Sequence, residues 1–153
     1  MKLDVIQSPS DELVQSLRSR IRALNRDNWP DVRRQPLAVA LHDDRGELVA
    51  GASGSSFGHW LQLDWLWVDD RLRGEGWGSR LLHEFEGQGR ERGCRWCLLD
   101  TLEFQARPFY ERRGYRAVWE QRDYPLSGCR SYMVKALPAA EAKADPAPQT
   151  GSR

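Results

Sequence analysis

The spacing of apolar residues predicts the first elements of the chain. Residues 2–6 form a short apolar stretch that favours a strand, and apolar side chains then recur at helical spacing over residues 13–24. Ser10, followed by two acidic residues, is a good N-cap for a helix of roughly fifteen residues. Residues 25–36 show no period and predict a long loop.

Alternating and continuous apolar runs predict a meander of strands in the middle of the chain. Residues 37–42 and 47–51 predict a hairpin around a turn at 43–46, and glycines 51, 54 and 58 are expected to break or bend the chain after this hairpin. Residues 60–68 predict a long strand. A strict period of two puts Gln62, Asp64, Leu66 and Val68 on one face of this strand, and Leu61, Leu63, Trp65 and Trp67 on the other.

Helices and strands alternate in the second half. A glycine-dense turn leads into a helix marked by apolar residues from 78 to 89 and closed by Gly93. The pattern then predicts a strand at 96–99, a helix at 105–113, and strands at 115–119 and 130–137. This order indicates an α/β domain, residues 1–137, with a mixed sheet and helices on its faces. Residues 138–153 lack any period and are expected to be a disordered tail.

Composition narrows the classes of function. Lys plus Arg number 23 and Asp plus Glu number 22, a balance that argues against a nucleic-acid partner. The sequence contains no run of 18 apolar residues, so it predicts no membrane span. The first residues do not resemble a signal peptide, and we therefore expect a cytoplasmic protein. Cys94 and Cys97 have the spacing of a metal or redox pair, but no second pair or histidine accompanies them. We therefore expect reduced thiols and no metal site.

The glycine-dense turn carries the clearest chemistry. Residues 68–82 read as a strand, a glycine turn and a helix N-terminus, which is an arrangement that binds phosphate through free N–H groups. Its position in mid-chain counts against a dinucleotide-binding unit, and it lacks the Gly-Lys-Ser/Thr ending of a nucleoside-triphosphate loop.

Two segments in register resemble the GNAT superfamily of N-acetyltransferases. Arg73, Gly76 and Gly78 occupy the places of the family's pyrophosphate-loop signature. The segment Tyr110-Glu111-Arg112-Arg113-Gly114-Tyr115 resembles its Tyr-Glu-x-x-Gly-Phe/Tyr signature. The resemblance extends over about residues 36–137. It implies a twisted, mostly antiparallel sheet splayed between two parallel strands, with helices on both faces.

The resemblance also implies acetyl transfer from acetyl-CoA to a primary amine by direct attack in a ternary complex. The acceptor would be a small amine, or the lysine or N-terminus of a peptide. A non-catalytic acyl-CoA sensor or interaction module is the alternative, and the protein would be a monomer or a homodimer. The residues expected to hold acetyl-CoA are Leu66, Trp67, Val68, Arg73, Gly74, Glu75, Gly76, Trp77, Gly78, Ser79 and Gln105.

Catalysis then falls to two side chains. Tyr110 matches the family's usual acid for the thiolate, although it could be a core tyrosine. Asp64 is the candidate base, acting through water, or else only attracts a cationic acceptor. It could also be a strand-edge residue paired to an arginine or turned to water. Asp100 is a weaker alternative base. Candidate acceptor-binding residues are Trp29, Trp65, Asp100 and Tyr124.

Overall fold

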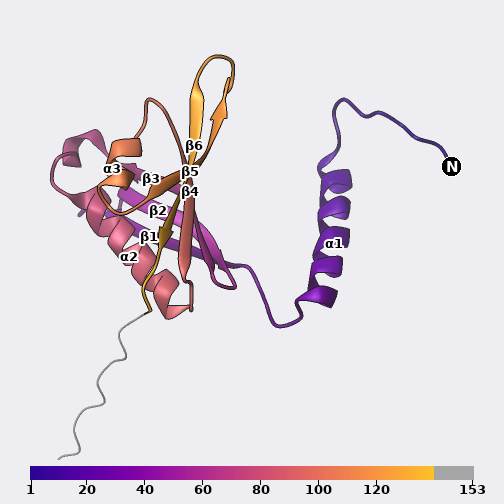
Figure 1. The fold of residues 1–153 in the computed structure, drawn as a ribbon, viewed down its shortest axis with the longest axis horizontal. Coiled ribbons are helices and arrows are strands. Elements are labelled where there is room, and N and C mark those ends of the chain that lie inside the picture. Colours follow the sequence, from indigo (N-terminus) through magenta and orange to yellow (C-terminus); the bar gives the residue numbers. More distant parts are fainter. Residues whose placement is uncertain (140–153) are drawn as a thin grey trace, which may run out of the picture. The chain divides into compact units, whose positions relative to one another are not determined.

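The computed structural model describes residues 1–139, which fall into two compact units divided after Arg33 (Figure 1). The expected tail lies almost wholly outside the described residues. The expectation that residues 1–137 act as one domain stays a prediction.

The first unit contains one helix, α1, Asp11–Asn28. Ser10 caps it, because its Oγ accepts a hydrogen bond from the Leu13 N–H at 3.2 Å, as expected. The helix runs four residues into the predicted loop, and regular structure resumes at Gln35. The predicted strand at 2–6 is wrong: these residues are exposed and pair with no strand of the described residues, and a lone strand has no partner for its backbone groups.

The second unit is built on a six-stranded sheet in the order β1-β2-β3-β4-β6-β5. The strands are β1 (Gln35–His42), β2 (Leu48–Phe57), β3 (Trp60–Val68), β4 (Trp96–Leu102), β5 (Arg116–Arg122) and β6 (Cys129–Ala136). The helices are the short 3-10 turn η1 (Asp70–Leu72), α2 (Trp77–Glu91) and α3 (Arg107–Glu111). Neighbouring strands are antiparallel except β3 and β4, which confirms the predicted mixed sheet with one parallel pair.

Glycine does not interrupt β2 as predicted. The strand continues through Gly51 and Gly54 because position 54 needs a residue without a side chain: a Cβ there would overlap the carbonyl oxygen of Gln62 in β3. The glycine thus permits a close approach of the two strands rather than ending one of them.

A β-bulge at Asp64 changes the faces of β3. Trp65 pairs with Ser53 and Leu63 pairs with Gly54, which leaves Asp64 as an extra residue. The side-chain alternation therefore shifts by one, and the predicted faces are wrong beyond Leu63. Leu66 and Val68 share the core face with Leu61 and Leu63, whereas Trp65 and Trp67 lie on the other.

Helix α2 covers the core face of the sheet beside β1, β2 and β3. Phe85 and Leu82 of this helix are buried with Leu61, Leu99 and Met133. Helix α3 lies on the same side, because a Cβ at Gly78 of α2 would come within 3.4 Å of the Phe109 ring. Cys94 and Cys97 are buried free thiols, as predicted.

One charged cluster is buried under the sheet. Glu86 of α2 is 3% exposed and accepts hydrogen bonds from the Tyr115 hydroxyl at 2.8 Å and the Lys135 ammonium at 2.7 Å. The carboxylate is therefore paired and hydrogen-bonded, as a buried charge requires.

The parallel strands separate after three residue pairs. Pairing joins residues 60–62 of β3 to residues 96–98 of β4 and stops there, although both strands continue. The sheet is thus split between the C-terminal parts of β3 and β4 (Figure 1), as the resemblance implied.

Candidate active site

A pocket of about 1160 Å³ lies at the split between β3 and β4. Its walls come from β3, the turn before α2, β4, α3 and the β5–β6 hairpin. It brings together most of the predicted site residues: Asp64, Trp65, Leu66, Trp67, Val68, Arg73, Gly74, Gly76, Trp77, Gly78, Ser79, Asp100, Gln105, Tyr110 and Tyr124.

Unpaired N–H groups gather where α2 begins. The first helical bond runs from the Arg80 N–H to the Gly76 carbonyl at 3.1 Å, and no acceptor is found within residues 1–139 for the N–H groups of residues 74–79. Gly74 and Gly76 both have φ of +82°, with open space where a Cβ would point. The turn can therefore receive an anion on its backbone.

Arg113 is a cation at this end of the pocket that sequence reasoning missed. Its guanidinium lies 3.6 Å from the centre of the Phe109 ring, and it donates to Ser79 Oγ and to the Phe109 carbonyl. Burial, with a smaller effect of Arg112, lowers the pKa of Arg113. Its place within the segment 110–115, which carries the Tyr110 signature, was the available signal. Arg73, by contrast, pairs with Asp70 at 2.7 Å on the exposed surface.

Strand β3 directs backbone groups into the split. The Asp69 N–H donates to the Val49 carbonyl, and antiparallel pairs alternate between hydrogen-bonded and non-hydrogen-bonded residues. Trp67 therefore bonds to β2, while the N–H and C=O groups of Leu66 and Val68 point away from β2 into the opening. These groups can bind an extended ligand arm.

Tyr110 is held by packing with its hydroxyl directed at the pocket. The side chain is 7% exposed, and its ring meets Phe109 and Tyr115 edge-on at centroid distances of 5.1 and 5.7 Å. Every fully buried side-chain polar atom in residues 1–139 has a hydrogen-bond partner. The Tyr110 hydroxyl has no partner there, so it is not fully buried, and we infer that it is exposed at the wall of the pocket that Tyr110 lines. Burial raises the pKa of Tyr110 to about 12, with smaller effects of Cys97 and Asp100, which keeps the phenol protonated.

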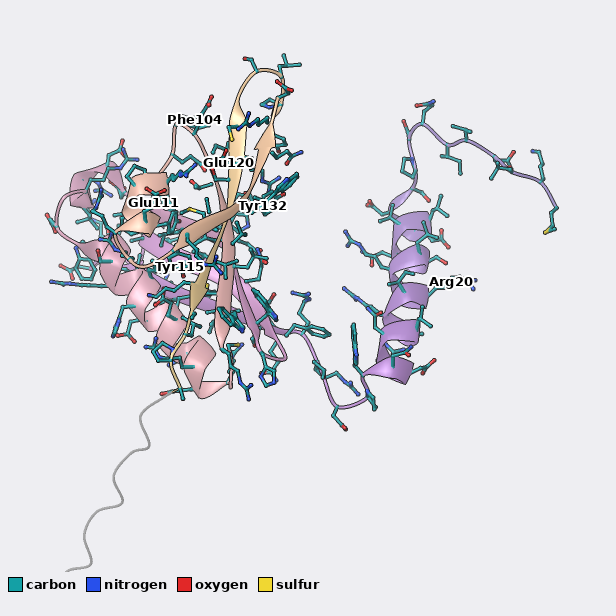
Figure 2. The ribbon with its side chains drawn as sticks, viewed as in Figure 1. Arg20, Phe104, Glu111, Tyr115, Glu120 and Tyr132 are labelled. Carbon is teal, nitrogen blue, oxygen red and sulfur yellow. The ribbon has the colours of Figure 1, made fainter. Side chains whose placement is uncertain are left out.

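Two ion pairs of Arg107 hold the helix that carries Tyr110. Arg107 donates to Glu111 within α3 at 2.8 Å and to Glu120 of β5 at 2.6 Å. Figure 2 labels the two glutamates that receive these bonds. Because α3 has only five residues, this tie to the sheet helps to define its position.

The two predicted carboxylates have different surroundings. Asp64 is exposed on the bulge, and no ion pair to it is found in the described part of the chain. Asp100 instead pairs with Arg130, whose Nε lies 2.6 Å from Oδ2. Asp64 is therefore the carboxylate that remains available to solvent and to a cation.

Several predicted site residues have local structural roles as well. The Gln105 side-chain oxygen accepts from the Leu102 N–H at 2.8 Å and so closes the turn before α3. Glu75 accepts from the Trp77 indole at 3.2 Å and is not among the described residues that line the pocket. Trp29 belongs to the first unit, where its N–H donates to the Asn25 carbonyl, and its role in acceptor binding stays a prediction.

Residues 1–139 contain neither a cluster of metal ligands nor a helix suited to a bilayer. No group of three or more His, Cys, Asp or Glu side chains could hold a metal ion there. None of their helices combines the length and the apolar character needed to cross a membrane.

Comparison with known proteins defines the class as acetyltransferase. The model of the "Acetyltransferase (GNAT) family" matches residues 4–115. The chain belongs to this family.

Three similar proteins align with this chain over nearly their whole length. A blasticidin-S acetyltransferase of Streptomyces morookaense is 38% identical over 141 residues, which are 90% of this chain and 99% of the relative. A crystal structure of an acetyltransferase from Bacillus cereus ATCC 14579 is 30% identical, with a TM-score of 0.78 over 88% of this chain and 98% of that one. An aminoglycoside 6'-N-acetyltransferase complexed with coenzyme A shares the fold, with 20% identity and a TM-score of 0.61 over 90% of this chain and 100% of that one.

Proposed function

We propose that this acetyltransferase moves the acetyl group of acetyl-CoA to a primary amine by direct attack in a ternary complex. The observation that carries the proposal is one continuous pocket. It joins the unpaired N–H groups before α2, the free backbone groups of Leu66 and Val68, and the hydroxyl of Tyr110.

The donor end fits acetyl-CoA. The N–H groups of residues 74–79 and the Arg113 guanidinium would hold its pyrophosphate, since both favour oxyanions. The backbone groups of Leu66 and Val68 would hold the pantetheine arm and favour negative charge on the thioester oxygen. Acetyl-CoA itself supplies an activated acyl group.

Two proton transfers then fall to side chains of the pocket. The amine nitrogen bonds to the thioester carbon, the carbon–sulfur bond breaks, and the electron pair leaves with sulfur. Asp64 takes the amine's proton through water, and Tyr110 gives its phenolic proton to the sulfur. Three unpaired cysteines among the described residues also suit the reducing cytoplasm, where we place the reaction.

The test is release of free thiol from acetyl-CoA with a panel of amines. The panel includes blasticidin S, because the Streptomyces relative is named for it, together with small amines and peptides with a free lysine or N-terminus. We expect release with at least one acceptor and an N-acetylated product by mass spectrometry. Tight binding of acetyl-CoA without release from any acceptor would favour the sensor function instead.

A further inference from the structure

Arg130 is a charged side chain of the pocket that the proposed reaction does not use. It lies in β6, opposite Leu102 of β4, and lines the same pocket as Asp64 and Tyr110. Its side chain is 28% exposed, so it is accessible but largely enclosed.

Three neighbours hold the guanidinium in place. Its Nε donates to Asp100 Oδ2 at 2.6 Å, and its carbon lies 5.3 Å from the Tyr124 ring centre and 5.2 Å from that of Tyr132. Arg130 and Tyr132 come from β6, Tyr124 from the hairpin, and Asp100 from β4 (Figure 2 labels Tyr132). Such a clamp leaves the group little freedom to lose when it binds a ligand.

The clamp leaves specific atoms unsatisfied. Within residues 1–139 no acceptor is found for Nη1 or Nη2 of Arg130, and no donor for Oδ1 of Asp100. The pair thus presents two donor nitrogens and one acceptor oxygen. Because the two charges of the pair nearly cancel, the best complement is a molecule with both an anionic and a cationic group.

The pair lies on the opposite side of the sheet from the glycine turn before α2, whose N–H groups at residues 74–79 are proposed to hold the pyrophosphate. Leu99 and Thr101 of β4 are buried on the face covered by α2, so Asp100 and Leu102 project from the other face. Trp65 and Trp67 of β3 also project there. Arg130 therefore lies on the face away from the turn proposed to hold the phosphates of the donor, where an acceptor could reach it.

We propose that the acceptor is an amine that also bears a carboxylate, and that Nη1 and Nη2 of Arg130 bind this carboxylate. This inference rests on the proposed acetyltransferase function. A planar carboxylate matches the two-nitrogen edge of a guanidinium held against two aromatic rings. The cationic amine of the same molecule is attracted by Asp64 and Asp100.

The experiment compares acceptors that differ only in the anionic group. Thiol release is measured for β-alanine against β-alaninamide and O-phosphoethanolamine, and for L-lysine against L-lysinamide. We expect kcat/KM to be about 10- to 100-fold higher for the carboxylates than for the amides, mainly through KM. Equal values for acid and amide, or a preference for the phosphate ester, would overturn the proposal.

Variants assign the preference to Arg130. Arg130→Gln should raise KM for the carboxylates to that of the amides with little change in kcat, and Arg130→Lys should restore part of the preference. Arg122→Gln is the control, because Arg122 is exposed in β5 and its one ion pair within residues 1–139 is with Glu120, at 3.9 Å. An unchanged preference in folded Arg130→Gln and Arg130→Lys would refute the assignment.

A binding measurement separates this inference from the proposed function. Calorimetry of β-alanine and β-alaninamide with the protein saturated with CoA needs no turnover. Absence of thiol release with preferential, Arg130-dependent binding of β-alanine would remove the proposed chemistry but keep the carboxylate site. Thiol release with amines, but without preferential binding of β-alanine, would keep the proposed chemistry and remove the carboxylate site.

Discussion

At the scale of the residue, burial decides what Tyr110 can do. A pKa near 12 means that the phenol is neutral at any pH at which the enzyme would work. Its proton is therefore present for donation at neutral pH, where ionisation of the phenol does not limit the rate.

The variant Tyr110→Phe tests this proton. It keeps the ring packed against Phe109 and Tyr115 and removes only the hydroxyl. We expect kcat to fall by about 10²-fold while the affinity for acetyl-CoA is kept. Tyr115→Phe is the control, since its hydroxyl bonds to Glu86 and its loss should reduce stability rather than kcat. Unchanged turnover of Tyr110→Phe at neutral pH would exclude it as the acid.

Cys97 makes a prediction about pH and stability. Burial raises the pKa of this thiol to about 12, whereas an unfolded thiol ionises near its ordinary value of 9. The stability due to its neutral form is fully present below pH 9 and is lost as the pH rises toward 12. The free energy of unfolding can be measured by urea denaturation in the presence of reductant. Above pH 9 it should fall less steeply with pH in Cys97→Ala than in the parent protein, by up to about 1.4 kcal/mol per pH unit. Parallel losses in the two proteins would contradict this.

At the scale of the element, the close approach of β2 and β3 next to the bulge requires glycine at position 54. Gly54→Ala forces a Cβ onto the Gln62 carbonyl, so we expect destabilisation of about 1–3 kcal/mol in thermal or urea unfolding. Gly87→Ala is a control of opposite sign. Among the described residues its Cβ would meet only the Arg90 side chain, at 3.6 Å, and alanine favours a helix over glycine by up to about 1 kcal/mol. A neutral Gly54→Ala would show that the two strands can separate without cost.

The same elements show what a single sequence can predict. The bounds of β3, the Ser10 cap and helix α2 follow from local periodicity and capping, and the structure confirms them. The bulge does not follow from them, because the extra residue is defined only against Gly54 on another strand. The predicted strand at 2–6 failed for a related reason: pairing is a property of two segments, and a local pattern describes one.

The residues of the site likewise fall into those that local motifs predict and those that depend on distant parts of the chain. The glycine turn and Tyr110 lie in contiguous motifs, so their presence in one pocket was predictable. Arg113 and Arg130 were missed because each gains its role from distant residues, Ser79 in one case and Asp100 in the other. The positions of arginines in the sequence do not show which of their side chains will line the pocket.

At the scale of the whole molecule, binding of the donor should appear as stability. With acetyl-CoA at 100 times its Kd, we expect a gain of about 2.7 kcal/mol and a rise in Tm of roughly 5–10 °C. Gly76→Asp should abolish this rise by placing a side chain and a negative charge at the phosphate turn. Gly46→Asp should keep it, since Gly46 in the β1–β2 turn has a similar φ of +81° and equally open space. A full rise in Gly76→Asp would place the donor elsewhere.

The split between β3 and β4 also bears on inhibition. The glycine turn before α2, which we propose binds the pyrophosphate, and the Asp100–Arg130 pair lie at opposite faces of one sheet and share one pocket. A single compound that joins the sulfur of CoA to an amino acid would occupy both ends through the opening. Its second end would bind at high effective concentration once the first is held. Such bisubstrate compounds should therefore bind far more tightly than CoA or the amino acid alone.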